Sequence, residues 1–315
     1  MTTRILASTS TRILSRPSSL LRAQSTRAMT VPTLLSVTEL KKQLGGPIVL
    51  DGSWHMPAEK RDPIQEFKNE HLPGARYFDI ESIKDKTSSF PHMMPTATQF
   101  AQQVGELGIT NNDHIVVYDT AGFFSAPRVY WMFKAFGHDK VSVLNGGLKA
   151  WKAAGYSVES GDGKVQAKEY KVPKLDIDVI RYHDQILQLV RDENSKTTII
   201  DARGADRFTG QAPEPRAGLS SGHMPGAKNV SFKQLFDSKT GELYDNAQLA
   251  SVFEKAGVDV SKLKNEPVVL SCGSGVTASV LYFALERLGL KKLAVYDGSW
   301  TEYASLNQGP IVKDL

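Results

Sequence analysis

Cysteine is almost absent from this chain, which has only one, Cys272, among 315 residues. A single cysteine cannot form an intrachain disulfide, so the sequence excludes a disulfide-stapled secreted fold and a zinc site built from cysteine clusters. The seven histidines also lack the close pair spacing that is typical of metal ligands. We therefore expect neither a metal site nor a cofactor.

Long apolar runs and early acidic residues are lacking too. No stretch approaches the ~18 apolar residues of a transmembrane helix, so we expect no membrane association. The first carboxylate is Glu39, and the first 30 residues contain five arginines and many hydroxyl side chains. This composition predicts a mitochondrial transit peptide at residues 1–30 and a matrix location, with a disordered basic tail as the alternative. A second start at Met29 would give a cytosolic form.

The excess of positive charge comes from that leader. Removing its five arginines from the 38 basic side chains leaves 33, against 34 acidic ones. The remainder of the chain is nearly neutral and gives no reason to expect a nucleic-acid surface.

The lone cysteine lies where a short apolar run, residues 268–271, gives way to a helical pattern at residues 276–288. A thiol at such a turn faces several backbone N–H groups and the positive end of a helix, and both favour the thiolate. Gly273 and Gly275 allow the backbone to curl around the sulfur. We interpret Cys272 as a nucleophile; the alternative is a small buried core residue.

The chain repeats itself at an offset of 152 residues. Residues 71–75, His-Leu-Pro-Gly-Ala, recur as His-Met-Pro-Gly-Ala at 223–227, residues 116–119 match 268–271, and Gly146 matches Gly298. This indicates two copies of one module of roughly 120 to 130 residues. At this offset Thr120 takes the place of Cys272, so the first copy is predicted to be structural or to lend side chains to a shared site.

Within each copy, short β-branched runs alternate with helical patterns, which predicts an α/β fold with a mainly parallel sheet and helices on both faces. In the second copy, the expected strands are residues 198–201, 267–271 and 293–296, and the expected helices are 183–190, 246–256 and 276–288. The predicted organisation is an N-terminal module at 34–154, a linker at 155–178 rich in Gly and Lys, and a catalytic module at 179–306.

The duplicated modules, the cysteine loop and the segment Tyr-Asp-Gly-Ser-Trp at 296–300 together resemble the two-domain rhodanese sulfurtransferases over residues 34–305. Within that family, the loop Cys-Arg-Lys-Gly-Val-Thr is typical of the thiosulfate branch. Residues 272–277 read Cys-Gly-Ser-Gly-Val-Thr, which is similar to the 3-mercaptopyruvate branch. The resemblance implies the tandem rhodanese fold and transfer of sulfur from 3-mercaptopyruvate.

The absence of cations from this loop agrees with that branch, because a compact dianion such as thiosulfate would favour cations there. Arg207 and Arg216 match the two family arginines that hold the α-keto carboxylate, and guanidinium pairs with carboxylate through two hydrogen bonds. The backbone of Gly273, Gly275, Val276 and Thr277 is expected to contact the transferred sulfur.

The resemblance also implies a serine–histidine–carboxylate relay. Ser274 matches its serine and His92 its histidine. The relay carboxylate falls on Glu81, where the family has aspartate; Asp79, two residues earlier, is the alternative. His71 and His223 begin the repeated turns and are expected to be structural.

The expected reaction is attack of the Cys272 thiolate on the sulfur of 3-mercaptopyruvate, giving a persulfide and pyruvate. With no second cysteine, the chain cannot resolve its own persulfide, so the acceptor must be external: a small thiol, thioredoxin, cyanide in an assay, or a sulfur-relay partner protein.

Two other functions compete with this interpretation, and a third can be excluded. Thiosulfate could be the donor, or the protein could be a persulfide carrier in tRNA thiolation with poor turnover. A cysteine phosphatase requires Cys-x5-Arg to clamp phosphate, and Ala278 stands at the sixth position after the cysteine. That residue excludes phosphatase chemistry.

Overall fold

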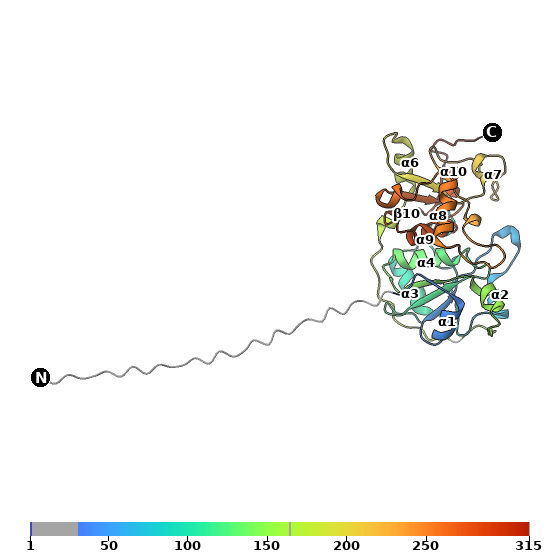
Figure 1. Cartoon of the computed structure of the whole chain (residues 1–315), viewed down its shortest axis with the longest axis vertical. Helices are drawn as coiled ribbons and strands as arrows, with labels where there is room; N and C mark the ends of the chain where they lie inside the picture. The colour runs from blue at the N-terminus through green and yellow to red at the C-terminus, as the bar shows by residue number, and fades with distance from the viewer. Residues whose placement is uncertain (2–30, 164, 315) are drawn as a thin grey trace. The chain divides into compact units, whose positions relative to one another are not determined.

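The computed structural model describes residues 1, 31–163 and 165–314 (Figure 1). The predicted transit peptide at residues 1–30 lies, apart from Met1, outside the described residues. Residues 31–315 form one unit that contains both copies of the repeat.

The first copy contains a five-stranded sheet in the order β1-β5-β4-β2-β3, and every neighbouring pair is parallel. Its strands are β1 (Leu34–Leu35), β2 (Ile48–Asp51), β3 (Arg76–Tyr77), β4 (Ile115–Tyr118) and β5 (Val141–Leu144). Its helices are α1 (Val37–Gln43), α2 (Pro63–Asn69), α3 (Ala97–Glu106), α4 (Ala126–Ala135) and α5 (Gly147–Ala153), with a 3-10 turn at Pro57–Glu59.

The second copy repeats this topology in the order β6-β10-β9-β7-β8, again all parallel. Its strands are β6 (Ile180–Arg181), β7 (Thr198–Asp201), β8 (Lys228–Asn229), β9 (Val268–Ser271) and β10 (Leu293–Tyr296). Its helices are α6 (His183–Arg191), α7 (Ala205–Thr209), α8 (Asn246–Lys255), α9 (Ala278–Arg287) and α10 (Ser299–Leu306), with 3-10 turns at Ile177–Val179, Phe232–Gln234 and Lys262–Asn265.

Successive residues of the central strands face opposite sides of each sheet, and both sides are covered by helices. In β4, Ile115 and Val117 pack with α3 and α4, whereas Val116 and Tyr118 pack with α1, α2 and α5. Strands buried on both faces read as continuous apolar runs, which is why β4 and β9 are buried at every position. The predicted fold class is confirmed.

Helices α4 and α9 lie side by side between the two sheets (Figure 1). Every residue of α4 except Lys134 is buried, as are the first eight residues of α9. Both helices are mainly apolar and buried on all sides, and they form one continuous core from the first sheet to the second. The two copies are therefore packed directly against each other.

The strands and helices predicted for the second copy are all present, with small differences at their ends. Helix α9 begins at Ala278, two residues later than expected, because Val276 and Thr277 belong to the loop after the cysteine. The two-residue strands β6 and β8 were not predicted, since so short a segment carries no periodicity.

The segment predicted as a linker lies along the first copy. Its Lys168 N–H donates to the carbonyl oxygen of Gly105, and its Tyr170 is buried beside Phe100, with ring centroids 6.0 Å apart. The described residues of this segment are therefore packed against the N-terminal module rather than forming a free tether.

Candidate active site

Cys272 follows β9 directly and is 1% exposed. The beginning of α10 fixes its backbone: the Ser299 hydroxyl accepts from the Cys272 N–H at 3.2 Å, and the Trp300 N–H donates to the Cys272 carbonyl at 3.0 Å. Thr301 binds the next carbonyl, that of Gly273, through both its N–H and its hydroxyl. The Tyr-Asp-Gly-Ser-Trp segment thus holds the cysteine in place.

The loop after the cysteine curls as tightly as its glycines permit. Gly275 has φ +78°, and a Cβ at this position would lie 2.7 Å from the Asp297 carbonyl oxygen, so only glycine fits. Within the described part of the chain, the backbone N–H groups of residues 273–277 donate to no protein acceptor. These N–H groups belong to the five residues that directly follow Cys272.

The corresponding loop of the first copy shows what such donors can hold. Ile115 and Val268 hold equivalent positions in the registers of the two sheets. The residue equivalent to Cys272 is therefore Asp119, and the match to Thr120 made from the sequence was wrong. The first loop is one residue longer, which hid the shift. The Asp119 carboxylate accepts four backbone N–H bonds at 2.7–2.9 Å, from Gly122, Phe124, Ser125 and Ala126. The repeated turn is therefore an anion-binding loop.

The three residues predicted as a relay lie in hydrogen-bonding contact, although 182 residues separate His92 from Ser274. The His92 Nδ1 is 3.1 Å from the Ser274 hydroxyl, and its Nε2 is 2.8 Å from Oε1 of Glu81. His92 is 2% exposed and adopts φ +60°, a left-handed conformation that is uncommon for a residue with a side chain. The strained turn directs the imidazole from the first copy at the cysteine loop of the second.

Glu81, and not Asp79, faces the imidazole. The Asp79 carboxylate accepts instead from the Glu81 N–H at 2.9 Å and from the Ser82 hydroxyl at 2.6 Å, which closes the local turn. Hydrogen bonding to His92 holds the pKa of Glu81 well below its usual range, with further lowering by Lys84 and Trp54. Burial lowers the pKa of His92 even though Glu81 opposes this, so the imidazole is neutral at neutral pH.

Arg207 and Arg216, the predicted carboxylate-binding arginines, lie against the cysteine loop. A Cβ placed on Gly273 would lie 3.5 Å from Nη2 of Arg207 and 3.9 Å from Nη1 of Arg216. Both guanidinium groups line a cavity of about 330 Å³ together with Cys272, Ser274, Val276 and Thr277. The cavity also receives Trp54, Met56 and Phe124 from the first copy, so both copies form its walls.

The two arginines differ in their partners. The Arg207 guanidinium donates to the Glu214 carboxylate through both Nε and Nη2. No carboxylate among the described residues lies within ion-pair distance of Arg216. Glu214 also pairs with the buried Arg203, whose guanidinium binds Asp201 and lies over the Trp300 ring. Arg216 thus offers an uncompensated positive charge, and burial lowers its pKa.

Several of these residues were missed in the sequence. Glu214 lies between Arg207 and Arg216 in the chain and could have been recognised as a partner of Arg207. Trp54, which donates to Oε1 of Glu81 at 3.0 Å, comes from the other copy, and no sequence pattern relates it to the cysteine.

Comparison with known proteins identifies the fold family. Two stretches of the chain, residues 36–154 and 183–306, match the rhodanese-like domain. The chain belongs to the rhodanese-like family. The two matched stretches correspond to the two sheets and their helices, so the chain is a tandem rhodanese.

Its relatives include sulfurtransferases of plants and bacteria. The mitochondrial thiosulfate/3-mercaptopyruvate sulfurtransferase 1 of Arabidopsis thaliana is 43% identical over 281 residues, covering 84% of this chain and 73% of the relative. The 3-mercaptopyruvate sulfurtransferase of Escherichia coli K12 is 39% identical over 264 residues, covering 84% and 91%. The crystal structure of SseA from Escherichia coli, a 3-mercaptopyruvate sulfotransferase, superposes with TM-score 0.75 at 35% identity, covering 86% of this chain and 99% of that one.

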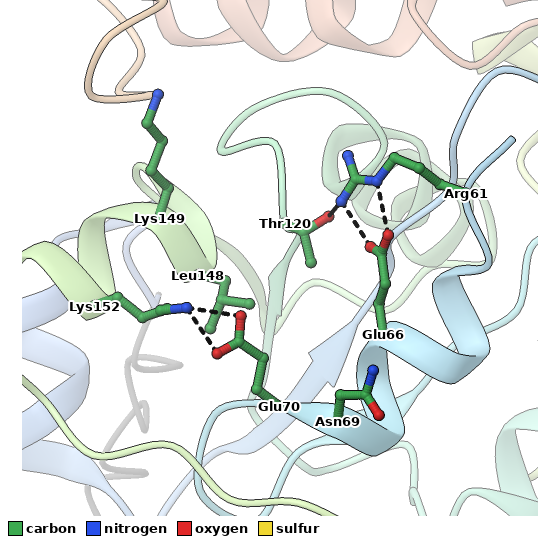
Figure 2. Close-up of a pocket in the computed structure, with 8 residues that line it drawn as sticks. All are labelled: Arg61, Glu66, Asn69, Glu70, Thr120, Leu148, Lys149 and Lys152. Carbon is green, nitrogen blue, oxygen red and sulfur yellow. Dashed lines mark hydrogen bonds and ion pairs between the residues drawn. The ribbon is translucent and has the colours of Figure 1, made fainter. Parts of the chain in front are cut away.

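The first rhodanese module has a larger hollow, of about 630 Å³, but four of its five charged side chains form ion pairs with one another (Figure 2). The Arg61 guanidinium binds the carboxylate of Glu66, and Lys152 binds that of Glu70 at 2.7 Å. Cys272 does not line this hollow but lines the smaller cavity, which is therefore the candidate active site.

The repeated histidines have structural roles in both modules. Nδ1 of His71 is 2.7 Å from the Phe67 carbonyl and the ring stacks on Phe67; His223 does the same with Phe208, at 2.9 Å. Among the described residues, no group of three potential His, Cys or carboxylate ligands could hold a metal ion. None of the helices in that part of the chain is long and apolar enough to traverse a lipid bilayer.

Proposed function

We propose that this rhodanese is a 3-mercaptopyruvate sulfurtransferase that forms a persulfide on Cys272. The observation that carries the proposal is the position of two guanidinium groups, Arg207 and Arg216, beside a cysteine loop that itself has no cation. This arrangement suits a donor whose carboxylate lies a few bonds from its sulfur. The name shared by the bacterial and plant relatives supports the same donor.

In the first half-reaction, the Cys272 thiolate attacks the thiol sulfur of 3-mercaptopyruvate. An S–S bond forms, the C–S bond breaks, and its electron pair remains on the carbon as pyruvate enolate. The enolate gains a proton at this carbon to give pyruvate, and the new persulfide loses its proton. The transfer of sulfur therefore requires no external oxidant or reductant.

Ser274, His92 and Glu81 move the protons that this step requires. The Ser274 hydroxyl lies on the cysteine loop and lines the cavity, so it can pass a proton to the enolate and recover one through the neutral imidazole of His92. Glu81 stabilises the imidazolium that forms in transit.

The persulfide sulfur is held by the loop itself. The N–H groups of residues 273–277 surround the nucleophile, as those of the first module surround the Asp119 carboxylate. A negative sulfur bound by such donors is stabilised without a cation, and the site remains accessible to an external acceptor. We propose a small thiol or a protein thiol such as thioredoxin as that acceptor, because the chain has no second cysteine.

The domain assignment follows from this chemistry. The module at 179–306 supplies the nucleophile and the arginines, the module at 34–154 supplies His92, Glu81 and the apolar wall but no nucleophile, and residues 155–178 connect them. We also propose that residues 1–30 direct the protein to the mitochondrial matrix and that initiation at Met29 gives a cytosolic form. The mitochondrial relative in Arabidopsis thaliana supports the first of these locations.

Thiosulfate is the second candidate donor, because two Arabidopsis thaliana relatives are named for both donors. The ratio of kcat/KM values decides between them. We expect a ratio strongly in favour of 3-mercaptopyruvate; equal values, or values that favour thiosulfate, would reverse the assignment.

Mass spectrometry of the intact protein tests the mechanism directly. Incubation with 3-mercaptopyruvate should add one sulfur atom, about 32 Da, to Cys272 and release an equal amount of pyruvate. The Cys272→Ser variant should show neither. An unmodified Cys272 in the wild type would rule out the enzymatic mechanism. An adduct whose sulfur is hardly transferred to any small thiol would instead identify a persulfide carrier.

A further inference from the structure

Each module contacts the other through an equivalent segment at their interface. In the first module, the segment after β3 carries His92 to the cysteine loop, and the Met94 N–H donates to the Asp297 carboxylate at 2.6 Å. In the second module, the segment after β8 returns the contact: the Leu243 N–H donates to the Asn145 side chain at 2.8 Å. Asn145 and Asp297 occupy the same position, directly after β5 and β10.

This exchange is symmetric in geometry but not in charge. The first module has a neutral amide, Asn145, where the second has the carboxylate of Asp297. On the helices between the sheets, the position of Arg128 in α4 is taken by Val280 in α9, since both helices begin 152 residues apart. Only the side that faces Cys272 therefore has an ion pair, with Arg128 Nη2 2.9 Å from Oδ1 of Asp297.

Arg128 joins three segments of the active site. Besides Asp297, its guanidinium donates to the carbonyl oxygen of Gly275 at 3.3 Å and to that of His92. Gly275 and His92 both hold positive φ angles, +78° and +60°. The cation thus binds the backbone of the loop that bears Ser274 and of the turn that bears the imidazole.

The pair is costly to keep, which argues against a role in stability alone. Arg128 is fully buried and Asp297 is 1% exposed, and replacing a buried ion pair by well-packed neutral residues is often neutral or stabilising. The Arg128 Nε also finds no hydrogen-bond acceptor among the described residues. The reciprocal side of the interface shows that a valine and an asparagine satisfy the same packing.

We propose that Arg128, paired with Asp297, is a positioning residue that the first module provides for the sulfur-transfer reaction. By holding the carbonyl groups of His92 and Gly275 at once, it sets the distance between the imidazole and the Ser274 hydroxyl. This inference rests on the proposed function, because the proton relay is what the alignment serves. It also explains why a module without a nucleophile is packed so tightly against the catalytic one.

The test is the double variant Arg128→Val with Asp297→Asn, which copies the neutral pair of the reciprocal side. We expect kcat with 3-mercaptopyruvate to fall at least tenfold, while KM changes less than threefold because Arg207 and Arg216 are untouched. Arg128→Lys keeps the charge but has a single ammonium group for three partners, so its kcat should lie between those of the double variant and the wild type.

A second readout requires no substrate: the titration of His92 followed by NMR in the full chain, assigned with His92→Gln. The charged groups around His92 are Glu81, Arg128 and Arg216, together with Asp297, which is paired with Arg128. Of this pair, Arg128 carries the charge that disfavours the imidazolium. Removing the charge of Arg128 in the double variant should move the titration of His92 to higher pH. Loss of stability alone would not produce this shift.

The matched control is Tyr130→Phe, two residues further along α4. It removes the hydrogen bond of 2.6 Å between Tyr130 and Glu286 at the same interface, near the opposite end of α9 from the cysteine loop. Its kcat and its His92 titration should remain those of the wild type.

A folded double variant with kcat within twofold of the wild type and an unchanged His92 titration would overturn the proposal. If the wild type itself does not turn over 3-mercaptopyruvate, the proposed function fails, and the His92 titration still decides whether Arg128 positions the imidazole.

Discussion

Replacing Glu81 with Gln removes the charge at the end of the relay and keeps the size of the side chain. The carboxylate accepts from Nε2 of His92 at 2.8 Å, from Nε1 of Trp54 at 3.0 Å and from Nζ of Lys84 at 2.7 Å. A hydrogen bond to a charged group contributes about 1.5–3 kcal/mol and one between neutral groups about 0.5–1.5 kcal/mol, so the substitution costs the relay roughly 1–2 kcal/mol. Because the Glu81 side chain is 45% exposed, solvent screening places this loss at the lower end of that energy range.

We therefore expect kcat for 3-mercaptopyruvate to fall about 5- to 10-fold in Glu81→Gln. KM should hardly change, because Glu81 does not line the cavity. The assay is steady-state release of pyruvate with an excess of a small thiol acceptor, measured across pH.

Glu81→Asp provides a more demanding test, since it restores the aspartate typical of the family. Removing one methylene shortens the reach of the side chain by about 1.5 Å, which is enough to break the contact with His92 if the turn does not move. We expect Glu81→Asp to be no more active than Glu81→Gln. The control is Lys84→Met, which removes an exposed ion pair of Glu81 and should alter kcat less than threefold. If Glu81→Gln kept kcat within twofold of the wild type, the relay would be refuted.

Three further outcomes follow from the structure. Arg216→Gln should raise KM for 3-mercaptopyruvate roughly 10- to 150-fold, from the ~1.5–3 kcal/mol of a charge-assisted contact, and a KM within threefold would exclude this arginine as the carboxylate anchor. Asp119→Asn should lower Tm by several degrees, since it weakens an acceptor of four N–H groups by about 1–3 kcal/mol, and calorimetry beside a kcat assay should show that the folded protein keeps its activity. The lowered pKa of Glu81 makes its contribution to stability complete above its unfolded value of about 4.3 and lost as pH falls below it. The Tm difference between the wild type and Glu81→Gln should therefore shrink below pH ~4; a difference that grew on acidification would contradict this sign.

The parts of the fold that depend on local chemistry could be predicted from the residues alone. Buried parallel strands must be continuous apolar runs, so β7, β9 and β10 were found within one residue of their ends. A repeat of the same motifs at one spacing revealed the two modules, because each copy must bury the same surfaces. The nucleophile was recognisable because its loop is local: strand, cysteine, glycine, helix.

Errors arose where the register of the copies changed. One residue inserted into the first loop moved the equivalent of Cys272 from Thr120 to Asp119, and only the hydrogen-bonded pairing of β4 with its neighbours shows this. The two-residue strands at the sheet edges are formed by pairing and not by propensity, so no sequence pattern marks them.

The sequence by itself determined the family, the modules, the lone cysteine and the candidates for its partners, because each rests on a short motif whose chemistry is carried by neighbouring residues. The tertiary structure decided which of those candidates meet. It selected Glu81 over Asp79, paired Arg207 with Glu214 while leaving Arg216 without an ion pair among the described residues, and buried Arg128 against Asp297. The last of these contacts joins residues 169 positions apart in the sequence, and a contact of that kind is set by the packing of one module against the other.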